Sequence, residues 1–419
     1  MNQIERRVVD AIDTEAMLRF LGELVGIRSL DGHESEAQRF MARSMRSFGM
    51  AVDEWEIDLA ALRQHPAFCW EVERAEGLGV VGWLGEDRGG RSLILNGHVD
   101  VVPAGDEANW GHAPWRATLD NGQVYGRGAL DMKGGLACAL FAAKAIRDAG
   151  VSLRGRLLVQ SVIGEEDGGC GTLASILRGH TADGAIIPEP TELAIAPAQA
   201  GALNFRLIVP GLSAHGCVRE EGVSAIEKFI PLHRALLELE AERNARERSP
   251  LFARYRLPYP LSIGVLRAGD WPSSVPESLV CEGRYGIAIG EDAASARAEF
   301  EAAVARAVAA DPWLAQRPPT VEWWGGQFDP AAIPADHPLA QTLAGAYADA
   351  AGAAPRFEGM TYGADMRLLM NVGGIPTVMF GPGDVRHAHR PDEHVPLAHL
   401  HAAVRTLALA ALRFCGYDE

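Results

Sequence analysis

The sequence predicts an α/β fold in which a mostly parallel, doubly wound main sheet is interrupted by an inserted ferredoxin-like α+β domain. Three observations support this prediction. Apolar, β-branched runs alternate with helical patterns up to about residue 200, which is typical of a parallel sheet covered on both faces. From residue 201 the expected order becomes βαββαβ, the ferredoxin-like layout. After residue 324 the α/β pattern returns, so the second domain interrupts the first.

Residues 1–200 are expected to supply most of the main sheet and its covering helices. Apolar side chains recur at helical spacing from residue 14 onward, and Gly49 and Gly150 each follow a helical pattern as a C-terminal glycine would. The expected helices cover residues 14–25, 34–48 and 134–148, and the expected strands cover 51–57, 79–84, 92–95, 156–163 and 184–187.

Residues 201–323 are expected to form the inserted domain. Its expected strands cover 202–209, 261–266, 279–289 and 320–323, and its expected helices cover 222–243 and 292–310. We expect the strand 202–209 to lie at a sheet edge beside an apolar face of the first helix, and an exposed edge usually has to be paired or covered. The sequence therefore predicts a homodimer through this domain. Residues 324–419 complete the main domain, with helices expected at 338–350 and 399–414 and a strand at 377–380.

Composition excludes several classes of partner. The chain has 419 residues and a net charge of −16, so nucleic acid and anionic membrane surfaces would repel it. No apolar run approaches the roughly 20 residues of a membrane span, and the N-terminus lacks the apolar region of a secretion signal. The six cysteines are scattered without a C-x-x-C pair, which predicts reduced thiols and a cytoplasmic protein.

Two neighbouring motifs point to a metal site. The first, NGHVDVVPAG, follows a buried strand and places His98 two residues before Asp100. A histidine and a carboxylate at this spacing suit a metal ligand and the partner that orients it. The second motif, YGRGALDMKGG, ends a glycine-rich loop at Asp131, just before a helix. A carboxylate there is free to meet a cation, so the two motifs together predict a metal site.

Further candidate ligands follow other strands of the main sheet. Ligands of open α/β sheets bind beyond the carboxyl ends of the strands, and Glu165, Glu166, Glu189 and His389 are expected near that edge. The alternative is that residues 165–167 form a solvated acidic loop, which the other candidates make less favourable. Three histidines, His387, His389 and His394, lie close together near the C-terminus, and spacing alone does not choose among them.

The adjacent Glu165 and Glu166 suggest two separate roles. Two neighbouring carboxylates repel each other, and a cation relieves this repulsion for the one that binds it. The other carboxylate is then suited to act as a general base on water. His215, in GLSAHG, lies in a glycine-flanked turn of the inserted domain and is too remote in the predicted fold to be an obvious ligand.

The strings NGHVDVVPAG, YGRGALDMKGG, GEED, PEPT, GLSAHG and AHRPDEHV, in this order, resemble the acetylornithine deacetylase / succinyl-diaminopimelate desuccinylase family of zinc aminoacylases and carboxypeptidases. The resemblance covers nearly the whole chain. It implies two zinc ions per subunit, with cobalt or manganese as substitutes, bridged by Asp131. One ion would also bind His98 and Glu189, and the other would bind Glu166 and His389.

The resemblance also implies roles for residues that are not ligands. Asp100 would orient His98, Glu165 would be the general base, and the Asp131-Met132 peptide would be cis. His215 would bind the carbonyl oxygen of the substrate from the partner subunit of a dimer. The inserted domain would be the family's lid and dimerisation domain.

One departure from the family concerns substrate binding. Many members have Asn-x-x-Pro in the lid and, ten residues beyond the proline, an arginine that grips a substrate carboxylate. Here Ser273 stands at the asparagine position before Pro276, and Gly286 stands at the arginine position. Arg284 lies two residues earlier, so in a strand it would point to the same face and could substitute; the alternative is that the substrate lacks a carboxylate at this point. The string TYGADMR looks closest to a branch that includes an N-formyl-aminopyrimidine deformylase.

We therefore expect a di-zinc amidohydrolase that removes an acyl group from a small N-acyl amino acid such as N-acetylornithine. The alternatives are a deformylase of an N-formyl-aminopyrimidine, or a dipeptidase or carboxypeptidase, which share the metal residues and differ in the pocket. A non-catalytic binding protein on the same fold is disfavoured, because a base that binds nothing, Glu165, has little structural reason to be present.

Overall fold

The computed structural model describes residues 1–418, which divide into two compact units. The larger unit comprises Met1–Ala198, Ala332–Glu358 and the chain from Ala364 onward, and the smaller comprises Gln199–Ala331 with Gly359–Gly363. The predicted domain boundaries were 200/201 and 323/324. The second division lies later because strand β12 (Thr320–Phe328) runs on to Phe328 within the smaller unit.

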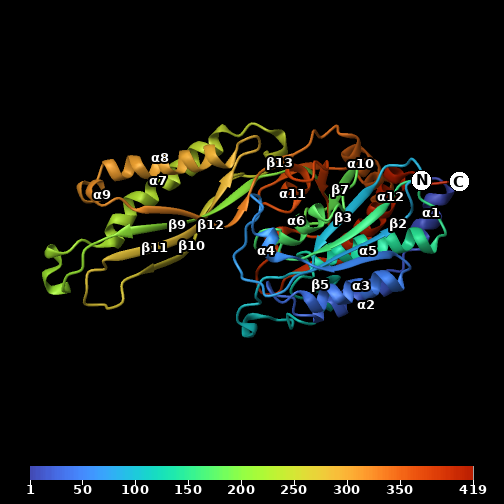
Figure 1. The fold of residues 1–419 in the computed structure, drawn as a ribbon, viewed down its shortest axis with the longest axis horizontal. Coiled ribbons are helices and arrows are strands. Elements are labelled where there is room, and N and C mark those ends of the chain that lie inside the picture. The colour runs from blue at the N-terminus through green and yellow to red at the C-terminus, as the bar shows by residue number, and fades with distance from the viewer. Residues whose placement is uncertain (419) are drawn as a thin grey trace. The chain divides into compact units, whose positions relative to one another are not determined.

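The larger unit is built on a sheet of nine strands, in the order β1-β2-β6-β3-β7-β15-β8-β13, with β14 paired to β8 (Figure 1). The central strands β6, β3, β7 and β15 are parallel, and antiparallel strands flank them. The predicted fold class is confirmed. The strands are β1 (Ala51–Glu56), β2 (Leu78–Leu84), β3 (Leu93–His98), β6 (Leu157–Val162), β7 (Gly184–Ile187), β8 (Ile195–Gln199), β13 (Ala331–Ala332), β14 (Phe357–Met360) and β15 (Thr377–Met379).

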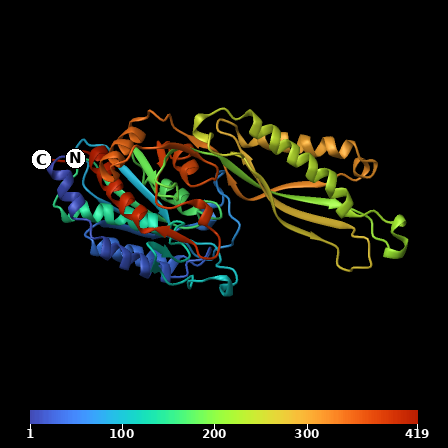
Figure 2. The same ribbon diagram turned by 180° about the vertical axis from the view of Figure 1, so that it is seen from behind.

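Helices cover both faces of this sheet. Adjacent residues of β2 point to opposite faces, so Gly82 faces Met45 of α3 whereas Trp83 contacts His180, which follows α6. Helices α3, α5 and α12 pack on the first face, with α1, α2 and α10 against them, and α6 and α11 pack on the other (Figures 1 and 2). These helices are α1 (Gln3–Asp10), α2 (Thr14–Gly26), α3 (Ser35–Ser47), α5 (Lys133–Asp148), α6 (Cys170–Leu177), α10 (Pro338–Ala351), α11 (Met366–Asn371) and α12 (Leu397–Cys415), and the short α4 (Leu59–Leu62) lies beside α6.

Strand β3 is fully buried along its length, as expected for a central strand covered on both faces. It is longer than predicted, because parallel pairing with β6 continues to His98, opposite Val162. The histidine is therefore the last residue of the strand and not the first residue of a loop. This position fixes its backbone at the carboxyl edge of the sheet.

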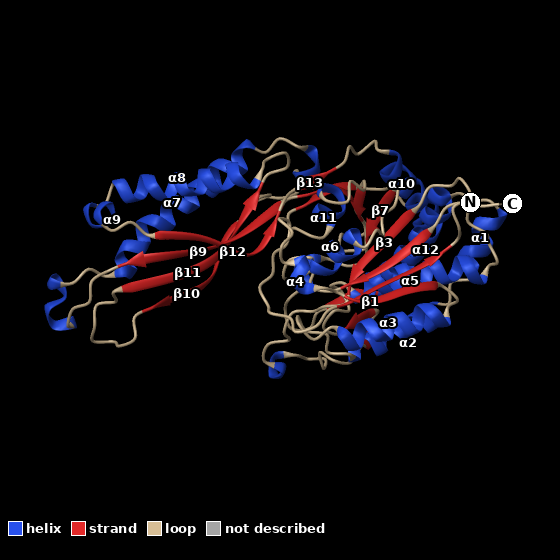
Figure 3. Cartoon of the chain, viewed as in Figure 1, coloured by secondary structure: helices blue, strands red, loops and turns tan. Residues whose placement is uncertain are grey.

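The smaller unit has the predicted βαββαβ order, with a sheet in the order β10-β11-β9-β12 and two long helices, α7 and α8, packed on it (Figure 3). One prediction is wrong here. Strand β9 lies between β11 and β12 and is not an edge, because the two helical crossovers place the first strand inside the sheet; the edges are β10 and β12. The elements are β9 (Gly201–Pro210), α7 (Ala225–Arg246), β10 (Leu261–Ala268), β11 (Ser278–Ile287), α8 (Ala293–Ala309) and α9 (Pro312–Gln316).

A third sheet, β16-β5-β4, joins the C-terminal region of the larger unit to the loop that precedes α5. Its strands are β4 (Thr118–Asp120), β5 (Gln123–Tyr125) and β16 (His394–Pro396). In residues 1–418 no helix has the length and apolar character needed to cross a membrane. The six cysteines all lie within residues 1–418, and no disulfide joins any two of them.

Candidate metal centre

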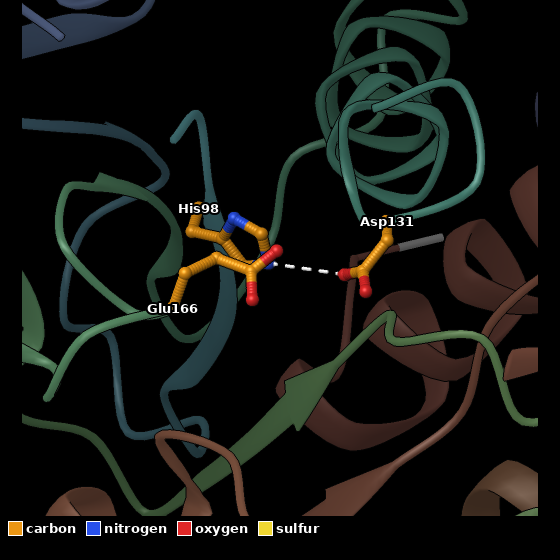
Figure 4. A group of neighbouring side chains, drawn as sticks. All are labelled: His98, Asp131 and Glu166. Carbon is orange, nitrogen blue, oxygen red and sulfur yellow. Dashed lines mark ion pairs between the residues drawn. The ribbon is translucent and has the colours of Figure 1, made fainter. Parts of the chain in front are cut away.

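Asp131 lies between two histidines that come from distant parts of the sequence. Its Oδ1 is 3.3 Å from Nε2 of His98, and its Oδ2 is 3.3 Å from Nε2 of His389. His98 ends β3 and Asp131 precedes α5, and Figure 4 shows these two side chains and Glu166 pointing toward one another. A carboxylate whose two oxygens face different imidazoles has the arrangement that a bridging ligand requires.

Two more carboxylates complete the cluster around these histidines. Oε1 of Glu166 is 3.0 Å from Nε2 of His389, and Oε1 of Glu189 is 3.7 Å from Nε2 of His98. Donor atoms of His98, Asp131 and Glu166 lie close enough together to hold one cation. The structure therefore brings together all five ligands that the family resemblance implies.

Glu165 lies in the same cluster, on the side of His98. Its Oε2 is 3.9 Å from Nε2 of that histidine, and the side chain is 10% exposed. Geometry alone would also allow Glu165 to serve as a ligand, since His98, Glu165 and Glu189 form a second group with ligand spacing. Position therefore does not separate a ligand from a base among these carboxylates.

Asp100 holds His98 differently from the prediction. Nδ1 of His98 is 2.9 Å from the backbone carbonyl oxygen of Asp100, whereas the carboxylate oxygen is 3.7 Å away. The carboxylate instead accepts a hydrogen bond from the backbone N–H of Glu166 at 3.0 Å. Because a carbonyl can only accept, the ring proton lies on Nδ1, which leaves the lone pair of Nε2 facing Asp131.

Burial and mutual contacts shift the pKa values of the ionisable groups in this cluster. Burial raises the pKa of Glu165 and Glu189 well above the usual range of a glutamate, and burial also raises the pKa of Glu166. Burial alone would lower the pKa of His389, but hydrogen bonds to Asp131 and Glu166 raise it to about 11. A divalent cation bound among these groups would compensate the carboxylates and release the protons that compete with it for the ligand atoms.

The donor set fits zinc or a similar divalent ion. Among residues 1–418, Nε2 of His98 is buried without a hydrogen-bond partner, and its lone pair faces the carboxylates of Asp131 and Glu189, with which it could share a cation. Imidazole nitrogen and carboxylate oxygen are ordinary zinc ligands. The peptide between Asp131 and Met132 is cis, as the resemblance implied.

The candidate residues of the lid lie in the smaller unit. His215 is exposed, and its Nδ1 accepts a hydrogen bond from the N–H of Cys217 at 3.2 Å, so the ring proton lies on the free Nε2. The backbone of Ser273 accepts a hydrogen bond from Gly216 at 2.7 Å, which brings the two predicted segments together. Nη2 of Arg284, in β11, donates to the carbonyl of Thr361 at 2.9 Å.

Two buried supports of the site were not predicted. Arg74 is fully buried and donates to Asp167 at 2.7 Å and to Glu34 at 2.8 Å, which anchors the loop that follows Glu165. Arg74 lies in a segment of no periodic pattern, so the sequence offered no signal for it. Burial raises the pKa of Asp365 to about 6, and this carboxylate accepts a hydrogen bond from Thr172 at 2.5 Å.

Comparison with known proteins decides the family. The profile of Peptidase family M20/M25/M40 matches residues 94–413 of the 419-residue chain. The chain belongs to this family. The predicted family is thereby confirmed, and the match includes every residue of the candidate metal centre. As a family member the chain is a hydrolase of amide C–N bonds, and the family is generally metal-dependent.

Curated relatives and a solved structure extend the comparison. The chain is 30% identical over 385 residues to the N-formyl-4-amino-5-aminomethyl-2-methylpyrimidine deformylase of Bacillus subtilis (strain 168), covering 87% of this chain and 85% of the relative. It is 30% identical over 347 residues to the acetylornithine deacetylase of Myxococcus xanthus, covering 82% and 85%. The Saccharomyces cerevisiae dipeptidase Dug1p shares the fold, with a TM-score of 0.78 over 99% of both chains at 14% identity.

Proposed function

We propose that this chain is a di-zinc amidohydrolase that removes a small acyl group from an N-acylated amine. The observation that carries the proposal is the position of Asp131, whose two carboxylate oxygens each lie 3.3 Å from a different histidine, His98 and His389. Glu189 would complete the site of His98, and Glu166 the site of His389. Zinc in these sites would polarise the acyl carbonyl and lower the pKa of a water molecule there.

Glu165 is assigned as the general base. It lies beside the ligands, and burial raises the pKa of its carboxyl group well above the usual range, with Glu189 adding to the shift. A carboxylate with a raised pKa is better matched to accepting a proton from water and passing it to the leaving amine. Asp100 would hold two residues of the site in place. Its carbonyl accepts a hydrogen bond from His98, and its carboxylate accepts one from the backbone N–H of Glu166.

An N-formyl group on an aminopyrimidine-like amine is the substrate that we favour. The alignment with the deformylase covers more of the chain than the alignment with the deacetylase at the same identity. The lid supports the same choice. A Cβ atom at Gly286 would lie 2.8 Å from the backbone of Tyr259, so an arginine there, which would grip a substrate carboxylate, does not fit.

An N-acyl amino acid, the substrate expected from the sequence, is the second candidate because of Arg284. Among residues 1–418 this guanidinium forms no ion pair, and burial lowers its pKa. A partly buried guanidinium without a carboxylate partner is suited to bind one from a substrate. Ser273, at the exposed turn beside Gly216, would then contact the same substrate from the lid.

The lid would act as part of a homodimer. Apolar side chains stand exposed along one face of α7, where Ile226 and Ile230 are each 45% exposed and Leu237 is 43% exposed. A second copy of the chain would cover this face. His215 would then stabilise the developing oxyanion of the substrate bound to the partner subunit, with its protonated Nε2 as donor. The predicted cytoplasmic location remains a prediction.

A substrate panel tests this proposal. The purified enzyme, stripped with a chelator and reloaded with zinc, would be assayed on the N-formyl-aminomethylpyrimidine, N-acetylornithine, an N-succinyl diamino acid and a dipeptide. We expect activity only after zinc is restored, and a kcat/KM at least about tenfold higher for the N-formyl compound, equivalent to about 1.4 kcal/mol. A preference for N-acetylornithine that Arg284→Gln abolishes would support the second candidate. No turnover of any amide by the zinc-loaded protein would contradict the proposal.

A further inference from the structure

The loop that carries Asp131 is wrapped around the carboxylate of Glu393, a side chain that is 0% exposed. One oxygen, Oε1, accepts hydrogen bonds from three backbone N–H groups of that loop: Gly128 at 2.8 Å, Leu130 at 3.1 Å and Asp131 at 3.2 Å. Successive backbone N–H groups that converge on one point form an anion-binding concavity. Here the anion is supplied by the protein itself.

The second oxygen of Glu393 is also occupied. Oε2 accepts a hydrogen bond from Nη1 of Arg127, whose side chain is only 2% exposed. Nη2 of this arginine donates to the carbonyl of Pro103 at 3.2 Å, and the guanidinium lies 5.2 Å from the ring centre of Trp110. Both carboxylate oxygens of Glu393 are thus bound to donors. Among the described residues, Glu393 does not belong to either group whose ligand atoms lie close enough together to hold a metal ion.

Glu393 belongs to the same chain segment as His389. The two residues are four positions apart, and strand β16, which begins directly after Glu393, is paired with β5, which ends just before the loop of Asp131. The backbone carbonyl of Glu393 also accepts a hydrogen bond from Gly126 at 3.0 Å. The side chain of Glu393 therefore joins two segments that carry candidate metal ligands. Its hydrogen bond to Asp131 connects residues that are 262 positions apart in the sequence.

We propose that Glu393 is a positioning residue of the metal centre, which fixes the orientation of Asp131 relative to His389. The proposal rests on the ligand roles assigned above to these two residues. The backbone of Asp131 donates directly to Glu393, so loss of the charge would weaken the hold on the end of the loop from which the carboxylate projects toward both histidines. The metal would then meet a ligand that is present but poorly oriented.

Metal affinity of the apoprotein tests this role without any substrate. Removal of residues that hold metal ligands in place typically weakens metal binding by about 10–100-fold. We expect Glu393→Gln to lower the affinity for zinc by about this factor, measured by competition with a chromophoric chelator. The visible spectrum of the cobalt-loaded variant is expected to differ from that of the wild type, because the coordination geometry changes.

The matched control is Glu5→Gln. Glu5 is also buried, is bound to an arginine, Arg413, at 2.8 Å, and accepts from the backbone N–H of Asn2 at 2.9 Å. It lies in α1, outside the metal centre, so its variant should bind zinc like the wild type. In the single variant Glu393→Gln, the buried guanidinium of Arg127 loses its carboxylate partner. The double variant Glu393→Gln with Arg127→Met removes this guanidinium, so it is expected to fold even if the single variant does not. It should still bind zinc weakly.

The results separate this proposal from the proposed function. If the wild type binds zinc tightly and the folded Glu393 variants match both it and the Glu5→Gln control in affinity and cobalt spectrum, the positioning role is wrong. If the wild type itself binds no zinc, the assignment of the metal centre fails first. Weak zinc binding in the Glu393 variants alone supports the role of Glu393.

Discussion

At the scale of single residues, the strongest prediction concerns Glu165. Glu165→Ala should keep its metals, because its carboxylate is assigned as base and the five ligands remain, but kcat should fall by about 10²–10⁴-fold. Metal content by mass spectrometry and kcat on the best substrate of the panel measure the two effects separately. The control is Glu166→Ala, which should lose metal as well as activity.

The outcome that contradicts this assignment is equally specific. If the Glu165→Ala protein kept a near wild-type kcat, Glu165 would not be the general base. A variant that loses one metal equivalent would instead make Glu165 a ligand, as the spacing of His98, Glu165 and Glu189 would permit.

The sequence identified the residue types of the site but not all of their contacts. The order of the motifs was sufficient to nominate His98, Asp131, Glu166, Glu189 and His389, and the structure brings these residues together. The contact of Asp100 was different, because whether its carbonyl or its carboxylate reaches His98 depends on backbone geometry at the end of β3. The role of Glu393 depends on contacts with a loop over 260 residues away, which no local pattern contains.

At the scale of elements, the docking of α1 on α12 predicts a pH dependence of stability. The Arg413 guanidinium of α12 holds the pKa of Glu5 below its usual range. A lowered pKa in the folded state means that the contribution to stability is present above the unfolded pKa of about 4.3, and is lost as the pH falls through the lower folded pKa. Glu5→Gln should therefore cost about 1–3 kcal/mol at pH 7 and progressively less below pH 4.

Urea denaturation of the wild type and of Glu5→Gln across this pH range measures the difference. A destabilisation that is the same at pH 3 and pH 7 would show that packing, and not the ion pair, sets the contribution of Glu5. Arg413→Met should cost more than Glu5→Gln at neutral pH, because it also removes the ion pair between Arg413 and Asp349, and its effect should likewise shrink as the pH falls.

Helices whose apolar side chains recur at regular spacing were predicted well, whereas short helices and the order of the paired strands were not. Helices such as α2, α3 and α10 carry apolar side chains at regular spacing, and they begin and end within two residues of the prediction. The eight-residue α6 and six-residue α11 were missed, because helices this short hardly establish a period. The position of β9 inside its sheet was also missed, because strand order is decided by tertiary pairing.

At the scale of the whole molecule, the exposed apolar face of α7 predicts a homodimer. Ile226, Ile230 and Leu237 recur at positions i, i+4 and i+11, which lie on one face of a helix. Ile230→Glu should convert the dimer to a monomer in light scattering at micromolar concentration. Leu119→Glu is the matched control, because Leu119 is an equally apolar side chain, 56% exposed, in the larger unit.

Dimer formation and activity should then change together. If His215 acts on the substrate of the partner subunit, Ile230→Glu should lower kcat about as much as His215→Ala, by about 10²–10³-fold for the loss of one oxyanion donor. A wild-type monomer with full activity at micromolar concentration would contradict both the dimer and the shared role of His215.

Asp131 is proposed to bridge two metal ions, and zinc-edge anomalous diffraction from a crystal of the zinc-loaded protein is the direct test of this bridge. We expect two anomalous peaks about 3.5–4 Å apart, one beside His98 and Glu189 and the other beside Glu166 and His389, with an oxygen of Asp131 on each. A single peak, or two peaks with Asp131 bound to only one of them, would contradict it.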